Sequence, residues 1–371
     1  MWLFTFLMFT IIVTTGGMTG LTPYFSRKAT PFGVAVNGKH DFVEAKKKRY
    51  AFLNILFSII ISLPLFVFPL LEDTQEMELW LGIFVLIAII GLMLFNFMLY
   101  IKYRKEVREW RTTVPEAQPS PKKKIVVDMA YHEKLSTRGH ASFFIWQFLI
   151  VLVTTVIILV FYDRIPDEIP IHWDSSFEVS RSIDKSVWGA LALPGMQLLM
   201  IPVFNASYHS IIKSKQKLSP FDPKQASENS RRFREAWSNF LFVITIATQL
   251  LFTIIAFVSM FGENLPSWLL IVVIIVYLLV TMGGAFYLTM RYGQAGEKLL
   301  AEEGQYYSDP EEDEKWLLGM IYYNKEDPSV FVEKRFGVGT ALNMGNKKAW
   351  LFIGGLILFT VLIILLTVAL D

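Results

Sequence analysis

The chain has no cysteine among its 371 residues and only five histidines. The absence of cysteine excludes disulfides, thiolate metal ligands and cysteine nucleophiles, and it leaves the redox compartment unreadable. Five scattered histidines are little material for a histidine-rich metal centre. Charged residues make up only 18% of the chain and sum to +2, which argues against nucleic acid as an electrostatic partner.

Familiar catalytic motifs are also missing. The chain contains no H-E-x-x-H, no G-x-S-x-G and no phosphate-binding G-x-x-x-x-G-K-[ST] sequence. No Asp, Glu, Lys or Arg lies within its long apolar stretches, so neither an intramembrane aspartate pair nor a charged proton relay can be placed there. We therefore expect a protein that is not an enzyme and that uses no cofactor or metal.

Hydrophobic residues make up 53% of the chain, and they include long apolar stretches. A helix of about 20 apolar residues crosses the hydrocarbon core of a bilayer, and its backbone groups are all paired internally. The sequence therefore predicts an all-α polytopic membrane protein with eight spans. The predicted spans are residues 1–19, 50–71, 79–101, 143–162, 187–209, 237–260, 268–290 and 349–370.

The distribution of basic residues predicts the orientation of these spans. If the amino terminus is outside, the four internal connections hold 7, 10, 7 and 8 Lys and Arg, which is 32 of the chain's 35. This asymmetry follows the positive-inside rule, and a shift by one span would invert it. We expect a multi-pass protein of the cell membrane, in contact with membrane lipid, with both termini extracytoplasmic.

Composition along the chain divides it into five predicted regions. A proline-rich basic stretch, 115–124, is expected to be an extended linker, and 128–140 an interfacial amphipathic helix. Within the last internal segment, 330–344 favours one or two short strands with a glycine bend. The regions are a three-span part (1–142), a two-span unit with an outer loop (143–210), a basic loop with a two-span hairpin (211–290), a cytosolic module (291–348) and the last span (349–371).

One span combines prolines with intramembrane amides. Pro194 and Pro202 flank Gln197, and Asn205 follows one turn later. Because proline removes a backbone donor, we expect the helix to be kinked or locally unwound where Gln197 faces the bundle. Two interpretations stay open for this set, namely hydrogen bonding between packed helices and a binding site at a broken helix.

The longest outer connection carries the most distinctive local sequence. Pro166 and Pro170 favour an extended backbone that presents His172, Trp173 and Asp174 at the membrane surface, and Lys185 precedes the next span. A partner could bind this trio. A metal on His172 and Asp174 is the alternative to a hydrogen-bonded loop with Trp173 anchored in the interface.

This loop resembles the I-P-x-H-[WF]-[ND]-x-x-G-x-x-D-x-x-x-x-K segment of SdpI-type bacterial membrane proteins. The chain departs from that pattern at Phe177 and Ser180. A second stretch resembles a W-x-x-G-x-x-Y-Y-N-x-x-D-P module of unknown function found in longer Gram-positive members. The residues that match this module are Trp316, Gly319, Tyr322, Tyr323, Asn324, Asp327 and Pro328.

The resemblance implies immunity to a secreted toxic peptide together with signalling at the membrane. Our leading hypothesis is thus a non-enzymatic sensor or immunity protein that detects an amphipathic peptide or envelope stress outside and docks a cytosolic regulator inside. A transporter for a neutral or amphipathic solute that passes Gln197 is the alternative. A structural subunit of a larger membrane complex is the third hypothesis.

Overall fold

The structure is a computed structural model that describes residues 2–71, 75–115, 135, 140–174, 179–215, 222–262, 268–299 and 312–369. Eight helices in these ranges are long and apolar enough to cross a membrane. The prediction of an all-α polytopic membrane protein with eight spans is therefore confirmed. Almost all of the predicted linker and amphipathic segment between residues 115 and 140 lies outside the described residues.

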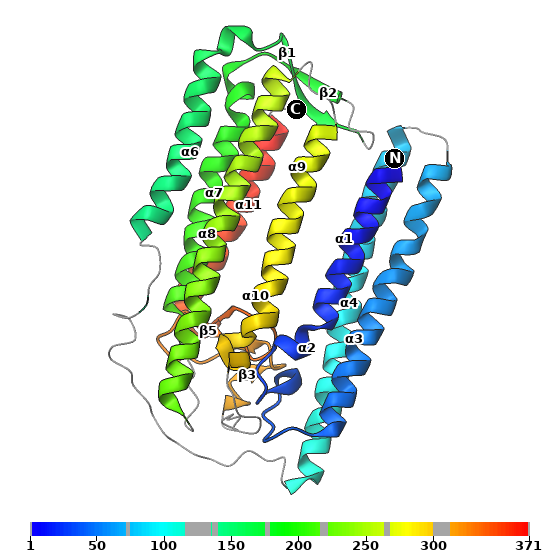
Figure 1. The fold of residues 1–371 in the computed structure, drawn as a ribbon, viewed down its shortest axis with the longest axis vertical. Helices are drawn as coiled ribbons and strands as arrows, with labels where there is room; N and C mark the ends of the chain where they lie inside the picture. The colour runs from blue at the N-terminus through cyan, green and yellow to red at the C-terminus, as the bar shows by residue number, and fades with distance from the viewer. Residues whose placement is uncertain are drawn as a thin grey trace. The chain divides into compact units, whose positions relative to one another are not determined.

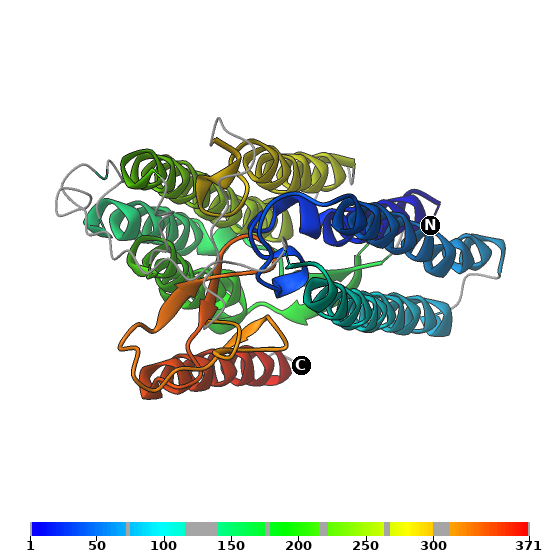
Figure 2. The same ribbon diagram turned by 90° about the horizontal axis from the view of Figure 1, so that it is seen from below.

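The chain forms two compact units, each built from discontinuous segments. The first comprises residues 1–133, 214–233 and 289–346, and the second comprises 134–213, 234–288 and 347–371. The first unit contains three spanning segments, which lie side by side in Figures 1 and 2. These are α1 (Trp2–Gly20), α3 (Asp41–Ser62) with the 3₁₀ segment η2 (Leu63–Leu70), and α4 (Gln75–Thr113).

Small residues allow α1 and α3 to approach closely. Gly16 and Gly20 are buried on one face of α1, where a β-carbon on Gly16 would collide with the side chain of Ser58. A β-carbon on Gly20 would lie 3.0 Å from the carbonyl oxygen of Ala51. Helices packed in lipid gain much of their contact energy from such close approaches, and the G-x-x-x-G spacing is a known signature of them.

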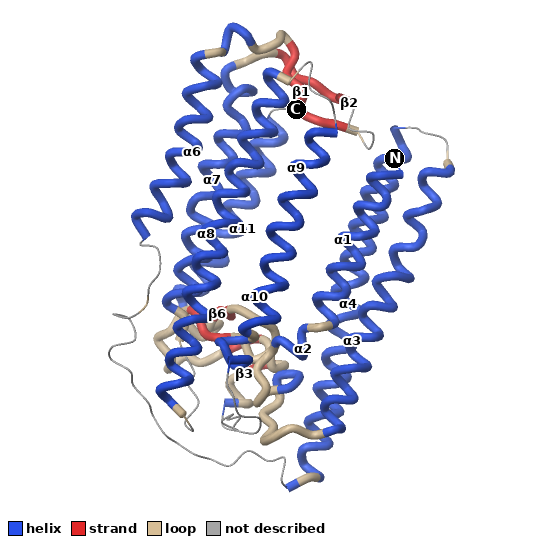
Figure 3. The backbone as a smooth tube through the Cα atoms, viewed as in Figure 1, coloured by secondary structure: helices blue, strands red, loops and turns tan. Residues whose placement is uncertain are grey.

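The second unit combines five spanning segments with a two-stranded sheet. The spans are α6 (His140–Val160), α7 (Val187–Lys213), α8 (Pro223–Phe261), α9 with η5 and α10 (Trp268–Leu278, Leu279–Gly283 and Gly284–Tyr292), and α11 (Lys347–Ala369). Strands β1 (Glu168–Trp173) and β2 (Val179–Asp184) form the hairpin between α6 and α7, drawn in red at the top of Figure 3. The start of α8 and the end of α10 belong to the first unit.

Residues 312–346, called the C-terminal module below, form two more hairpins in the first unit. One pairs β3 (Trp316–Leu317) with β4 (Ile321–Tyr322), and the other pairs β5 (Phe331–Glu333) with β6 (Thr340–Leu342). The second hairpin confirms the strands and glycine bend expected in 330–344. The first hairpin was not predicted, because its strands are only two residues long.

A loop that the sequence indicates only as a connection forms the core of the first unit. The loop from Ser26 to His40 follows the short helix α2 (Thr22–Phe25) and contains η1 (Pro31–Gly33), and Phe32 is fully buried there. Its ring lies between Tyr50 of α3, Tyr103 of α4 and Phe336 of the C-terminal module, with centroids 5.5, 5.7 and 5.9 Å away. The module is thus packed onto the helices through this aromatic cluster.

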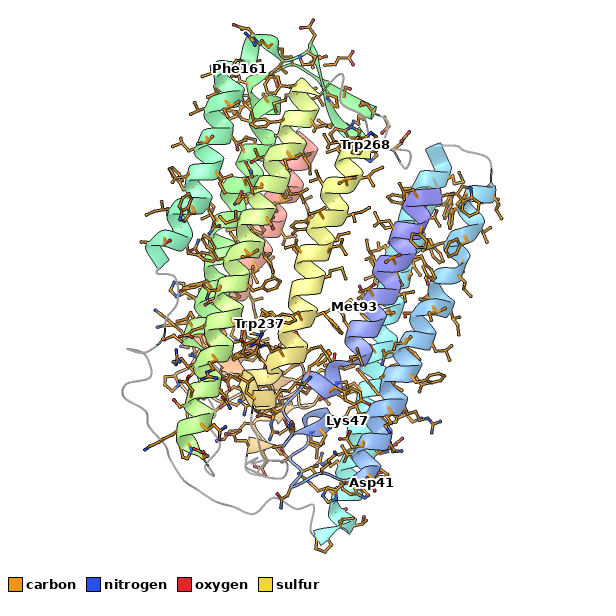
Figure 4. All side chains as sticks on the ribbon, in the orientation of Figure 1. Asp41, Lys47, Met93, Phe161, Trp237 and Trp268 are labelled. Atoms are coloured by element: carbon orange, nitrogen blue, oxygen red, sulfur yellow. The ribbon has the colours of Figure 1, made fainter. Side chains whose placement is uncertain are left out.

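Apolar side chains cover the outer surfaces of the spans, as lipid contact requires. Met93, labelled in Figure 4 on the apolar part of α4, is 66% exposed. Phe161 and Trp268 lie near helix ends at one end of the second unit, and Trp237 lies within α8 toward the other end (Figure 4). Tryptophan is commonly enriched at the two membrane interfaces, and these positions are consistent with that preference.

Candidate functional site

The β1–β2 hairpin carries the outer-loop residues that the sequence analysis selected. Its strands are antiparallel, with Glu168 opposite Asp184 and Ile169 opposite Ile183, and the register shifts on either side of His172. Pro170 lies at this irregularity, where a residue without a backbone donor is tolerated. The predicted extended backbone is present, and it is one strand of a hairpin.

The inner face of the hairpin is anchored on the ends of the helices. Ile165 and Ile169 are 3% and 1% exposed and belong to an apolar cluster with Ile158 of α6 and Met260 of α8. The Ser259 hydroxyl donates a hydrogen bond to the carbonyl oxygen of Pro170. The hairpin is therefore a rigid platform on the bundle rather than a free loop.

Lys185 fixes the short segment that connects β2 to α7. Its Nζ donates to the carbonyl oxygen of Ile165 at 2.7 Å and lies 5.1 Å from the centroid of the Tyr162 ring. Its backbone amide donates to Asp167 O, and the neighbouring Ser186 Oγ accepts from the amide of Gly189 in the first turn of α7. A lysine that satisfies carbonyls after a helix end is a positioning residue, so Lys185 holds the platform.

The other selected residues lie at the end of β1 and directly after it. His172 is exposed, and its Nδ1 lies 2.6 Å from the hydroxyl of Ser180 on β2, while Trp173 and Asp174 are half-buried. Ser180 is the position where the chain departs from the resembled motif, and it supplies this contact. Phe177, the other departure, lies outside the described residues. Within the described ranges, no group of three or more His, Asp or Glu side chains could hold a metal.

Gln197 faces the interior of the second unit, as predicted. Its Nε2 donates to Gln249 O at 2.7 Å and to Thr253 Oγ1 at 3.0 Å, and Gln249 Nε2 returns a bond to Gln197 O. Both glutamine side chains are fully buried, and neither Oε1 atom has a hydrogen-bond partner. An unpaired acceptor in a membrane bundle is costly, and these two oxygens share this feature with Gln147 Oε1 of α6 and Thr5 Oγ1 of α1.

The proline-containing span was expected to be kinked or locally unwound, and the structure shows no local unwinding there. Pro194 and Pro202 lie within one continuous helix, α7, and Asn205 donates to Ile201 O of the same helix. Membrane helices tolerate proline because neighbouring groups satisfy the freed carbonyls. An irregular helix occurs instead at η5, a π-helical turn from Leu279 to Gly283 that no sequence signal indicated.

The residues matched in the C-terminal module form its internal framework. Trp316 and Tyr322 are buried with their ring centroids 5.1 Å apart, and the Tyr322 hydroxyl donates to Asp327 at 2.9 Å. Lys215 pairs with the same carboxylate at 2.7 Å. Burial raises the pKa of Asp327, but these bonds and those from Ser329 outweigh it and lower the pKa to about 2. Asp327 is therefore an ionised carboxylate that joins Tyr322 and Lys215 within the first unit.

The remaining matched residues lie in turns or on the surface of the module. Gly319 has φ +73°, and a side chain there would collide with Arg104 of α4. Asn324 Oδ1 accepts from the amide of Glu326, and Tyr323 and Pro328 are exposed. No sequence signal indicated Asn343, which is fully buried and bonds to five backbone groups in this region.

Ion pairs tie the module to the first connecting loop. Arg27 pairs with Glu333, and its Nη1 lies 3.5 Å from Glu297. Burial raises the pKa of the Glu297 carboxyl, and the nearby positive charge of Arg27 offsets only part of this rise. Arg335 and Arg111 share Asp313, at 2.6 and 2.7 Å. Because these partners are up to 306 residues apart, no sequence spacing predicted them.

Two family models match the chain, and both describe segments of unknown function. A domain of unknown function, DUF1648, matches residues 149–198, which include the hairpin, and a family of unknown function, DUF5808, matches residues 325–350, which include Asp327 and Asn343. Such segments are typical of bacterial membrane proteins. No curated protein and no solved structure matches the chain.

Proposed function

We propose that this chain is a non-enzymatic sensor or immunity protein in which the β1–β2 hairpin, outside the membrane, binds a cationic amphipathic peptide. The observation that carries the proposal is the division of the hairpin into two faces. Ile169, Pro170 and Lys185 attach it to the bundle, whereas His172 and Ser180 form an ordered polar pair that faces outward. Binding surfaces are commonly built on such rigid supports, because little ordering entropy is then lost on association.

The charge of the outer connection favours a cationic ligand. Residues 163–186 contain six acidic and three basic residues, so their formal net charge is −3. Glu168 and Asp184 lie directly opposite each other across the strands, an arrangement that a nearby cation would stabilise. Val179 at the start of β2 and Trp188 in the first turn of α7, 52% and 82% exposed, add apolar surface to this region. The combination suits a peptide with one basic and one apolar face.

The cellular test is a variant that changes two side chains of the hairpin, the exposed His172 and the half-buried Trp173. We expect His172→Ala with Trp173→Ala to abolish resistance to cationic amphipathic peptides and the accompanying change in gene expression, with protein levels unchanged. The matched control is Trp268→Ala, which removes an exposed tryptophan from the start of α9. Unchanged resistance and expression in the double variant would refute the outer half of the proposal.

On the inner side, the proposal assigns the C-terminal module to a cytosolic regulator. Its support is a folded module that is tied to the first loop and to α4 by ion pairs and an aromatic cluster. Crosslinking in native membranes should recover a regulator with the full chain, and a deletion of residues 316–344 should lose it. Equal recovery from both chains would contradict this assignment.

A transporter for a neutral solute is the second candidate, and one observation favours it. Gln197 and Gln249 place two unpartnered amide oxygens inside the second unit, where a solute with hydrogen-bond donors would be satisfied. Flux of uncharged donors through proteoliposomes should then fall in Gln197→Leu and persist in Asn205→Leu. Equal flux in empty liposomes and in wild-type proteoliposomes would exclude transport of those solutes.

A further inference from the structure

The exposed apolar residues of the C-terminal module are confined to one hairpin. Strands β3 and β4 turn Trp316 and Tyr322 inward and leave the opposite face uncovered. Four large apolar side chains of this hairpin are exposed by 42–53%, and they are all such side chains in residues 312–346. They are Leu317, Leu318, Ile321 and Tyr323. A contiguous apolar face on a polar module requires a covering partner.

Two contacts place this hairpin at the membrane boundary. The hydroxyl of Tyr100 donates to Leu318 O at 2.9 Å, and Tyr100 lies at the end of the charge-free part of α4, which Lys102 terminates. At its other side, Tyr322 O accepts from the amide of Met344, three residues before α11 begins. The hairpin is therefore held at the end of the charge-free part of α4, and the chain runs on from Met344 into α11.

The turn of the hairpin has an unusual backbone. Leu318 has φ +50° and Gly319 has φ +73°, and the amide of Met320 closes the turn onto Leu317 O. Asn, Asp or Gly is the common residue at such a left-handed position, and a leucine there is strained. A strained leucine whose side chain is half exposed points to a role for that side chain outside the module.

We infer that the β3–β4 hairpin inserts Leu317, Leu318, Ile321 and Tyr323 into the headgroup and upper acyl region of the adjacent leaflet, and so anchors the C-terminal module to the bilayer surface. The depth set by Tyr100 selects lipid as the covering partner, because apolar side chains at that level meet acyl chains. Lys325 lies 6.0 Å from the ring centroid of Tyr323, where its ammonium group reaches the phosphate layer. This inference does not depend on the function proposed above.

The absence of native cysteine makes the test direct. Single cysteines are introduced in the full chain as Leu318→Cys and Ile321→Cys, with Glu326→Cys as the exposed control on the same module. Leu279→Cys, at a 68% exposed position within a span, is the lipid reference. All four variants are placed in phosphatidylcholine and phosphatidylglycerol nanodiscs, where both faces are accessible.

Two readouts decide the outcome. Reaction of Leu318→Cys and Ile321→Cys with a charged maleimide should be at least about tenfold slower than that of Glu326→Cys, because a low-dielectric site suppresses the thiolate. Spin labels at both positions should also be relaxed by oxygen more than by a water-soluble nickel complex, as at Leu279. Reaction as fast as at Glu326 would overturn the inference. Protection from both relaxation agents would also overturn it, since protein rather than lipid would then cover the hairpin.

Discussion

Asn343→Ala tests whether a single buried amide holds the C-terminal module together. The Asn343 Nδ2 atom donates to the carbonyl oxygens of Asn324, Asp327 and Ser329 at 2.9, 3.0 and 3.1 Å. Its Oδ1 atom accepts from the amides of Asn324 and Gly345, both at 3.0 Å. Each bond contributes about 0.5–1.5 kcal/mol net, so losing five should destabilise the module by about 3 kcal/mol or more.

Hydrogen exchange of the full chain in nanodiscs measures this loss. A destabilisation of about 3 kcal/mol should accelerate exchange of the amides between Asn324 and Ser329 by about 100-fold, with peptides from α3 unchanged. Asn346→Ala is the matched control, because its side chain donates an exposed bond to Pro328 O. If both variants exchanged at the same slow rate, the assignment of Asn343 as the organiser of these loops would be refuted.

Three further predictions concern packing and charge. Gly16→Val should lower the thermal midpoint of the detergent-solubilised protein by several degrees, and Gly17→Val, which meets nothing within 4 Å, should leave it unchanged. Arg27→Met should destabilise the first unit by about 3–5 kcal/mol in denaturant unfolding, because two carboxylates lose their buried partner; a change below about 1 kcal/mol would contradict this. Because the folded pKa of Asp327 is depressed to about 2, the module should lose stability as pH falls below about 4, and the same acid titration of Asp327→Asn should be flatter.

The spans were predictable because lipid imposes a simple requirement. Charge-free apolar stretches of about 20 residues must form helices, and this rule located all eight candidate spans. The β5–β6 hairpin was likewise readable from its β-branched residues and glycines. The close packing of α1 on α3 also had a signal, since Gly16 and Gly20 form a G-x-x-x-G pair, although the sequence analysis did not use it.

The details of the candidate site depended on contacts that the sequence does not encode locally. Lys185 is bonded to backbone carbonyls, which have no sequence signature, so its role as a positioning residue emerged only from the structure. Phe32 is buried because residues about 300 positions later fold over it. Of the kink or local unwinding expected at Pro194 and Pro202, the unwinding does not occur, because packing in the bundle supports a continuous helix.

The most direct test of the account measures peptide binding to the β1–β2 hairpin. A fluorescent amphipathic helix of lysine and leucine is titrated against the protein in phosphatidylcholine nanodiscs, with empty nanodiscs subtracted. The account predicts saturable binding that weakens at least about tenfold in His172→Ala with Trp173→Ala and is unchanged in Trp268→Ala. Equal affinity in all three proteins, or no binding beyond that of empty nanodiscs, would contradict the proposed recognition by the hairpin.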